Sequence, residues 1–436
     1  MAKPLNSAVS TDINLDIEAL RGFAALLVVW DHALLFSQLL DPGFQPSGPL
    51  AYQPSGHFCV LIFFVLSGYV IGMSNRQPLT GTSSLAYLKK RLVRLYPIYL
   101  VTLLLTLWGS AALIDKATII GNLALMQEAV VADINVPSWS LHYEMLYYLL
   151  FIGISLFQVR PLVVAGGALG VAVGNFLLYP WLPTPIITSY CYGLVFWVLG
   201  LALSRWLAGA RPQRSAAQVL VGCLFFMLCI DQFNLFDTLL HKSVGWLGLN
   251  VAFPKSVYWG KTVVTLFDLS YLPFALLIVL VFTGKQLPRK LLLVRGLVSF
   301  SALNLLYVAR HAYRGDLDGA AYGLPTLFLL ASLACLFARG RWLEVLSQRL
   351  IQAGTWLGSL SYGIYLIHFP LLVLLSRIKL FSGTWQSFGL RFALLLLLTV
   401  GVGYLLEKVM QPRLREFFFR RPATPALKLP ALGTAR

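Results

Sequence analysis

Charged residues are scarce in this sequence, and their scarcity decides the broad class of protein. Asp, Glu, Lys and Arg together make up 12% of the 436 residues, while hydrophobic residues make up 58%. Soluble domains have about a quarter of charged residues and about half of apolar ones. The composition therefore excludes an ordinary soluble enzyme and predicts an integral membrane protein with several spans.

Cysteine is also sparse, and its five positions show no chemical pattern. All of them fall inside apolar stretches, and no CxxC pair occurs. Structural zinc sites and redox dithiols depend on such pairs. We therefore expect neither a metal site nor a disulfide framework, and we interpret the cysteines as small packing residues.

Acidic residues are half as frequent as basic ones, 17 against 34, which gives a net charge of +17. A basic protein can bind nucleic acid, but here the basic residues stand between apolar runs rather than in one stripe. This distribution is typical of membrane topology signals, so no nucleic-acid partner is expected. When the N-terminus is placed in the cytoplasm, most Lys and Arg residues fall on the cytoplasmic side, which predicts an N-in, C-in topology.

The apolar runs give the fold class. A spanning helix needs about 20 mostly apolar residues. Runs of that kind lie at 20–40, 57–75, 92–113, 140–159, 161–179, 190–208, 216–235, 262–283, 291–309, 320–338, 354–376 and 388–410. The run at 291–309 is the most polar of them, and a shorter one at 117–131 is expected to be re-entrant or a short buried helix. We predict an all-α bundle of about 10–12 transmembrane helices, with residues 1–410 as the membrane domain and residues 411–436 as a basic cytoplasmic tail.

The first apolar run contains three residues that a bilayer disfavours: Arg21, Asp31 and His32. Eleven helical steps return to within roughly 20°, so Arg21 and His32 share a face and lie about 16 Å apart along the axis. Arg21 at a helix end can reach the interface and needs no function. His32 would lie near the middle of a hydrocarbon layer about 30 Å thick, where ionisable residues are functional candidates. A structural hydrogen bond of His32 is the alternative, and Asp31, which points elsewhere, is expected to pair with another helix.

Small residues mark two places where helices can approach closely. Ser67 and Gly68 interrupt the bulky run at 57–75, and the simplest interpretation is close packing there. Gly166, Gly170 and Gly174 are spaced four apart, which permits a close helix contact.

Two arginines, Arg91 and Arg94, stand at the start of the run at 92–113 and share a helical face because they are three residues apart. An ordinary positive flank of a membrane span explains them equally well. Paired arginines at a helix boundary also suit bidentate phosphate contacts. Pro97 just after them is expected to kink or break the helix.

Two further ionisable residues lie in apolar, aromatic sequence. Glu144 is surrounded by Trp139, Tyr143 and other tyrosines, and a buried carboxylate there needs a partner or a proton. The aromatic residues themselves are typical of a membrane interface belt. His368 precedes Pro370 by two residues, so it either caps a kinked helix or lines the cavity.

These segments in this order resemble the membrane-bound acyltransferase family 3. The resemblance rests on LDIEALRGFAALLVVWDH, FFVLSGYVIG, RLVRLYPIYL, PSWSLHYEMLYYL and LSYGIYLIHFPL, which extend from residue 15 to about 372. It implies an acyl-CoA co-substrate, usually acetyl-CoA, reached from the cytoplasm, and a hydroxyl acceptor on a glycan, a lipid-linked sugar or a secondary metabolite. No cofactor stays bound. This chain departs from the family in Asp31 beside the histidine, and the family usually has about ten spans.

The resemblance also implies roles for individual residues. The paired Arg and His of the first helix fall on Arg21 and His32, the two arginines before the third helix on Arg91 and Arg94, and the Glu of the Ser-Leu-x-x-Glu motif on Glu144. We expect the three arginines to hold the phosphates of CoA. His32 would deprotonate the acceptor hydroxyl, with an acyl-imidazole intermediate as the competing role. Glu144 would act with it by orienting a basic partner or the sugar, and Ser67, Tyr143 and His368 are further candidates for substrate contacts.

One rival from another class fits the same polar residues. Buried Arg, His and Glu also suit the substrate path of a transporter or flippase for a polar lipid or glycan. Such transporters often have repeated halves or paired broken helices, which the sequence does not show clearly. We therefore expect an O-acyltransferase of the bacterial inner membrane, with acetyl as the default acyl group, membrane lipids around it, and a cell-surface or lipid-linked glycan as the first choice of acceptor.

Overall fold

The computed structural model describes residues 14–110, 114–127, 129–177, 185–248, 263–338 and 340–419. In these ranges the regular structure is helical and no strand forms, which confirms the all-α prediction. The α-helices are α1 Leu15–Leu35, α2 Ser37–Leu40, α3 Gly56–Ser74, α4 Gly81–Gly109, α5 Lys116–Leu123, α6 Trp139–Leu156, α7 Pro161–Leu177, α8 Pro185–Trp206, α9 Ala217–Met227, α10 Ile230–Phe233, α11 Leu235–Trp246, α12 Leu272–Phe282, α13 Lys290–Ser301, α14 Leu305–Arg314, α15 Gly319–Phe337, α16 Arg341–Gly358, α17 Ser361–Leu375, α18 Trp385–Tyr404 and α19 Gln411–Phe419.

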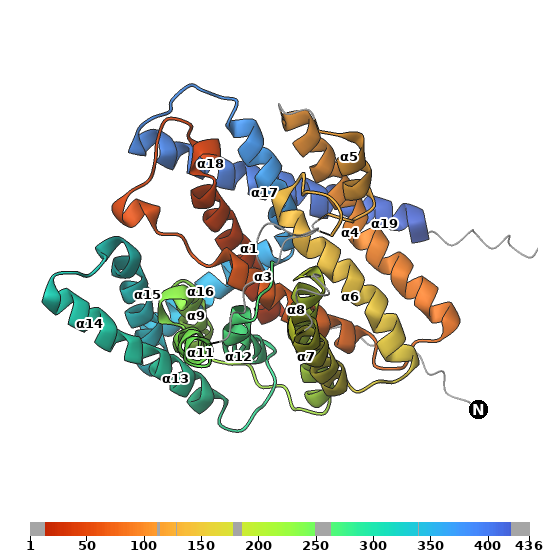
Figure 1. The fold of residues 1–436 in the computed structure, drawn as a ribbon, viewed down its shortest axis with the longest axis horizontal. Coiled ribbons are helices and arrows are strands. Elements are labelled where there is room, and N and C mark those ends of the chain that lie inside the picture. The colour runs from red at the N-terminus through yellow and green to blue at the C-terminus, as the bar shows by residue number, and fades with distance from the viewer. Residues whose placement is uncertain are drawn as a thin grey trace, which may run out of the picture.

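Several of these helices are able to cross a membrane, which confirms the predicted class of integral membrane protein. By length and composition, the described ranges contain six such helices, or seven if the bent pair α16–α17 is counted as one span. Figure 1 shows α1, α3 and α8 in the middle of the molecule, α13–α15 on one side and α4–α6 on the other.

Part of the difference from the predicted count of 10–12 spans arises because some apolar runs are not continuous helices. The run at 216–235 breaks after Met227, and the described part of the run at 262–283 begins with a 3₁₀ turn at Phe267–Tyr271. The run at 354–376 crosses a bend of 72° between α16 and α17. Hydrophobicity alone does not reveal such breaks, since a bent or 3₁₀ segment buries the same apolar side chains as a straight helix. The first part of the short run at 117–131 belongs to α5, which ends at Leu123 and whose Asn122 is buried.

The α3–α8 crossing depends on glycine. A Cβ atom placed on Gly68 would lie 1.9 Å from the carbonyl oxygen of Trp197, and one on Gly200 would lie 2.0 Å from that of Val65. Neither distance is possible for a real side chain, so the two backbones are in direct contact. This confirms close packing at Gly68.

The glycines of α7 behave differently from the expectation. A Cβ atom placed on Gly166, Gly170 or Gly174 would have no atom of the described residues within 4 Å. The close contact that their spacing permits is therefore not made within this part of the chain. Alanines on the other side of α7, including Ala168 and Ala172, are the residues that are buried.

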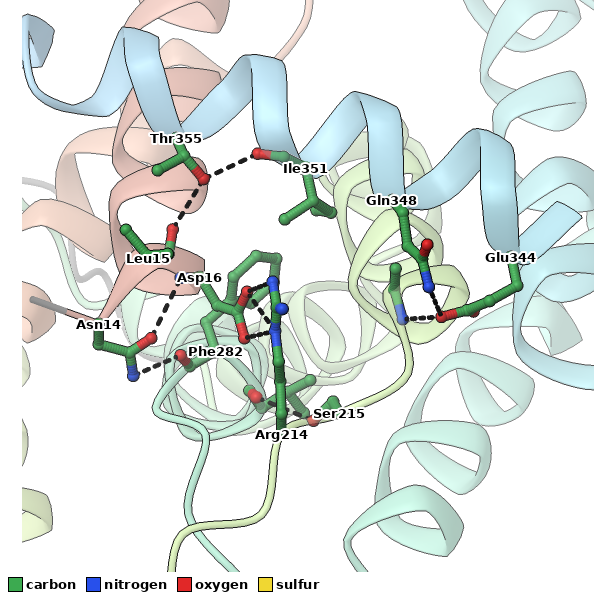
Figure 2. A network of polar contacts seen from close by, with 12 residues as sticks. Asn14, Leu15, Asp16, Arg214, Ser215, Phe282, Glu344, Gln348, Ile351 and Thr355 are labelled. Carbon is green, nitrogen blue, oxygen red and sulfur yellow. Dashed lines mark hydrogen bonds and ion pairs between the residues drawn. The ribbon is translucent and has the colours of Figure 1, made fainter.

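The N-terminal end of α1 is fixed by a polar network (Figure 2). Arg214 binds the carboxylate of Asp16 through Nε and Nη2 at 2.7–3.1 Å. Asn14 donates to the carbonyl of Phe282, and Glu344 of α16 accepts from the first backbone N–H groups of α9 at Ala217. These contacts join the start of α1 to Arg214 and to the end of α12, and they join the start of α9 to α16.

The last helices run on without interruption. After α18 the chain makes a π-helical turn at Leu405–Met410 and continues as α19, which packs on α4. The predicted tail thus begins as helix at Gln411, and its residues 420–436 lie outside the described residues. The division at residue 410 stays a prediction.

Candidate functional site

A cavity of about 280 Å³ lies between α1, α3, α4, α6 and α17. It brings together Arg21, Ser67, Arg91, Arg94 and Glu144, which the sequence places on four different helices. Tyr148, Tyr362 and Tyr365 also line it. The volume is close to the lower limit of ligand sites, about 300–1,000 Å³, and a cationic, aromatic lining suits an anionic ligand with an apolar part.

The three arginines of the cavity are held in different ways. Arg94 makes a bidentate ion pair with Glu407 of the π-helical turn, with Nη–Oε distances of 2.5 and 3.0 Å. Arg21 pairs with Glu18, one turn earlier on α1, at 3.0 Å. Arg91 stacks on aromatic rings instead of pairing with a carboxylate among the described residues.

The stacking of Arg91 connects it to the carboxylate of the site. Its guanidinium lies 5.4 Å from the ring centroid of Tyr87 and 5.5 Å from that of Tyr148. The hydroxyl of Tyr148 donates to Glu144, and the Nε atom of Arg91 has no hydrogen-bond partner in the described part of the chain. Arg91 is therefore oriented by aromatic rings, and its Nε–H is a donor without a partner among the described residues.

Glu144 is satisfied by hydroxyl groups. The Oγ atom of Ser67 donates to the carboxylate at 2.8 Å, beside the hydrogen bond from Tyr148. Ser67 in turn accepts from the indole N–H of Trp197 at 3.2 Å. Ser67 thus does more than pack: it connects α3, α6 and α8 at the wall of the cavity.

The two histidines singled out in the sequence form a pair. The Nδ1 atom of His32 on α1 lies 2.8 Å from the Nε2 atom of His368 on α17. The Nδ1 atom of His368 lies 3.2 Å from the carbonyl oxygen of Ile364, one turn earlier on the same helix. His368 is completely buried, so its ring is fixed from both sides.

The hydrogen-bond pattern determines where the protons of two neutral rings sit. A carbonyl oxygen only accepts, so the Nδ1 atom of His368 carries the proton and its Nε2 atom is an acceptor. The Nδ1–H of His32 then donates to that acceptor. The lone pair of His32 is consequently on Nε2, which lies 3.9 Å from Oδ2 of Asp31. The pair thus presents one free proton acceptor, on the side of His32 away from His368.

Tyr365 connects this pair to the cavity. It lines the cavity, and its ring centroid lies 6.3 Å from that of His368. Its hydroxyl donates to the carbonyl of Pro137 and shares a hydrogen bond of 2.8 Å with Ser140. Neither His32 nor His368 is a lining residue of the cavity, so the histidine pair lies beside the cavity, next to Tyr365.

Two other candidates lie outside the cavity wall. Tyr143 is fully buried behind Phe64, with which it stacks at 6.1 Å, and its hydroxyl is 2.7 Å from Ser189. Asp31 accepts from the amide of Gln53 at 2.5 Å. The partner of Asp31 thus lies in the connection that precedes α3 and not, as expected, in another helix.

Sequence reasoning missed Glu407 and the tyrosines of the site. Glu407 is a single carboxylate in an apolar run, which is the same signal that identified Glu144. Tyr148 stands among the aromatic residues around Glu144 that were interpreted as an interface belt, and Tyr365 was not singled out. Among the described residues, no group of three or more His, Cys, Asp or Glu side chains is placed to hold a metal ion.

Comparison with known proteins gives two matches. The family model described as an acyltransferase domain matches residues 14–301. The chain is also similar to the acyltransferase MdmB of Streptomyces mycarofaciens, with 30% identity over 149 residues that cover 31% of this chain and 37% of the relative. The matched region thus spans well under half of that relative. No solved structure matches. The family match includes the residues that line the cavity from α1 to α6, while His368 and Glu407 lie beyond it.

Proposed function

This chain belongs to the acyltransferase family whose domain model it matches, and from that premise we propose that it moves an acyl group from acyl-CoA to a hydroxyl group of a glycan. It is a membrane acyltransferase by family and composition. The donor, the acetyl group and the glycan acceptor are the parts that we propose, together with a place in the bacterial inner membrane.

The arginine cavity is the observation that carries the proposal. Its volume of about 280 Å³ is too small for a whole CoA molecule, so the nucleotide would stay at the mouth and the acylated arm would enter. Arg21, Arg91 and Arg94 come from two helices and meet there. Guanidinium groups bind phosphate oxygens with paired N–H donors, which makes this cluster suited to the phosphates of the donor.

The histidine pair supplies the base. The Nε2 atom of His32 takes the proton of the acceptor hydroxyl while the hydroxyl oxygen attacks the thioester carbon. The carbon–sulfur bond then breaks, and the leaving CoA thiolate takes the proton back from the imidazolium of His32. His368 keeps His32 in the tautomer that this step needs. The acyl arm would reach the pair along Tyr365, which lines the cavity and lies next to His368.

Glu144 has a supporting part in this proposal. Its carboxylate fixes Tyr148 through a hydrogen bond, and the ring of Tyr148 stacks on the guanidinium of Arg91. Glu144 therefore orients a basic partner indirectly. Both hydrogen bonds end on its Oε1 atom, and Glu144 lines the cavity, so in this proposal Oε2 accepts from a hydroxyl of the substrate.

The test measures CoA release from radiolabelled acetyl-CoA by purified protein in liposomes, with and without a lipid-linked glycan. His32→Ala is compared with His241→Ala, a change at an exposed histidine of α11. We expect release by the wild type and by His241→Ala, and none by His32→Ala. Trapping of labelled acyl-protein would favour the acyl-imidazole route. Silence of the wild type across acyl-CoAs and glycans, with movement of glycan across the bilayer, would identify a transporter instead.

A further inference from the structure

The C-terminal helix docks on the turn of α4 that carries Arg94. Pro97 has no N–H group, so the carbonyl oxygen of Val93 four residues earlier lacks its helical donor. The side-chain amide of Gln411 donates to that carbonyl at 2.7 Å and to the carbonyl of Arg94 at 3.3 Å. A proline of one helix is thus complemented by a glutamine more than 300 residues later.

Glu407 lies one turn before Gln411, inside the π-helical turn. Such turns are rare in proteins, and those that occur are often at functional sites. Its side chain is only 4% exposed, and besides Arg94 it accepts from the backbone N–H of Gly363 at 3.3 Å. A carboxylate that is buried to this extent is stable only when it is paired with a positive charge. Glu407 and Arg94 therefore depend on each other.

The pairing also fixes the direction of Arg94. Glu407 takes the two terminal nitrogens, Nη1 and Nη2, and the ring of Tyr362 covers one face of the guanidinium at 5.3 Å. Two of the five N–H donors of an arginine are used in this way. Arg94 also lines the cavity, and its Nε–H makes no hydrogen bond among the described residues, which leaves this donor for a ligand.

We propose that Glu407 is a positioning residue for the acyl donor: it clamps the end of Arg94 so that the side of the guanidinium is presented to a phosphate in the cavity. This inference rests on the proposed function in one respect, that the anion is a phosphate of the donor. Without Glu407 the charge of Arg94 remains, but its orientation is lost. Binding of the donor then weakens while the chemistry at His32 continues.

The experiment compares the wild type with Glu407→Gln, Glu407→Asp and a matched control, Glu344→Gln, which changes a carboxylate that caps α9. KM and kcat for acetyl-CoA are measured in liposomes, and inorganic pyrophosphate binding is measured on the same proteins. We expect Glu407→Gln to raise KM about tenfold, the equivalent of about 1.4 kcal/mol, with kcat almost unchanged. Glu407→Asp keeps the negative charge, so we expect its KM to lie between those of the wild type and Glu407→Gln. It serves as the test if the glutamine variant does not fold. Glu344→Gln should equal the wild type.

The two readouts separate this inference from the proposed function. If the wild type does not turn over acyl-CoA but binds pyrophosphate, and Glu407→Gln weakens that binding, the proposed function fails and the role of Glu407 stands. An unchanged KM with a reduced kcat in the folded Glu407 variants overturns the positioning role. Pyrophosphate binding that is equal in wild type and variants, or absent from the wild type, overturns it as well.

Discussion

The Nδ1 atom of His32 and the Nε2 atom of His368 lie 2.8 Å apart, although 336 positions separate the two residues in the chain. This contact joins the first helix of the bundle to α17, beyond the segment that matches the acyltransferase family model. Arg21 faces α17 as well, through the cavity that Ser361 and Tyr362 line. The shared face of Arg21 and His32 is therefore the side of α1 that faces α17.

The tautomer argument predicts different effects for two changes of His368. His368→Phe removes the acceptor for the Nδ1–H of His32, so we expect kcat to fall about 100-fold, within the range of general-base effects, with the KM for acyl-CoA unchanged. His368→Gln offers an amide oxygen as acceptor and should retain much more activity. Steady-state kinetics in liposomes decide this, with His241→Gln as control. Equal losses in the phenylalanine and glutamine variants would leave His368 with a purely structural role.

Arg91 is predicted to bind the donor by a different mechanism from Arg94. Because it is held by aromatic stacking on Tyr148 and not by a carboxylate, its charge is not neutralised in the cavity. Arg91→Gln should raise the KM for acyl-CoA at least about tenfold, since a hydrogen bond to a charged group contributes about 1.5–3 kcal/mol. Arg91→Lys keeps the charge but loses the planar stack, so an intermediate KM is expected.

The same measurement at increasing salt gives a second check on Arg91. Salt screens partly exposed charges, so the KM of the wild type should rise with ionic strength more steeply than that of Arg91→Gln. Arg349→Gln on exposed α16 is the control. A KM of Arg91→Gln equal to that of the wild type would show that this arginine is an ordinary flank of a membrane span.

The parts of the site that the sequence predicts are those with a local signal. The ionisable residues Arg21, His32 and Glu144 are conspicuous in apolar runs, and Arg91 and Arg94 share a helical face by their spacing alone. Four of these five line one cavity, while His32 pairs with His368 beside it. Depth in the membrane and helical periodicity are properties of single helices, so a sequence can reveal them.

The missing parts arise from contacts between distant helices. Nothing near Glu407 indicates that it meets Arg94, because the contact depends on how the last helix crosses α4. Tyr365 was passed over for the same reason. The bend between α16 and α17 could not be predicted from hydrophobicity, because the helices before and after it are both apolar or amphipathic. The spacing of Gly166 and Gly170 permitted a contact that the described residues do not make.

The glycines provide a matched pair of stability predictions. In Gly68→Ala the new methyl group meets the carbonyl oxygen of Trp197, a backbone atom that cannot move aside. Overpacking of this kind costs about 1–3 kcal/mol, so a lower Tm in detergent is expected. Gly170→Ala has open space among the described residues and gains helix propensity of up to about 1 kcal/mol. A Tm of Gly170→Ala as low as that of Gly68→Ala would contradict the assignment of the close crossing to α3 and α8.

A carboxylate far from the cavity ties two connections together. Asp41, which follows α2, is fully buried and accepts from Ser387 at 2.5 Å and from the backbone N–H of Gly383 at 2.9 Å. Burial by itself would raise the pKa of Asp41. The hydrogen bonds from Ser387, Gly383 and Gly43, together with the charge of Arg391, outweigh burial and lower that pKa below its ordinary value.

The sign of that shift predicts how stability depends on pH. Because the pKa of Asp41 is lower in the folded protein, its ionised form stabilises the fold at any pH above the unfolded value of about 3.9. This contribution is lost as the pH falls from about 4 through the folded pKa. Asp41→Asn should therefore lower the Tm in detergent at pH 7, and the difference from the wild type should shrink below pH 4. The same detergent is used at each pH, so that the comparison reports the protonation of the carboxylate. If the difference in Tm between Asp41→Asn and the wild type is the same at pH 7 and pH 3, the charge of Asp41 does not contribute. Asp41 would then act through its shape and hydrogen-bond geometry alone.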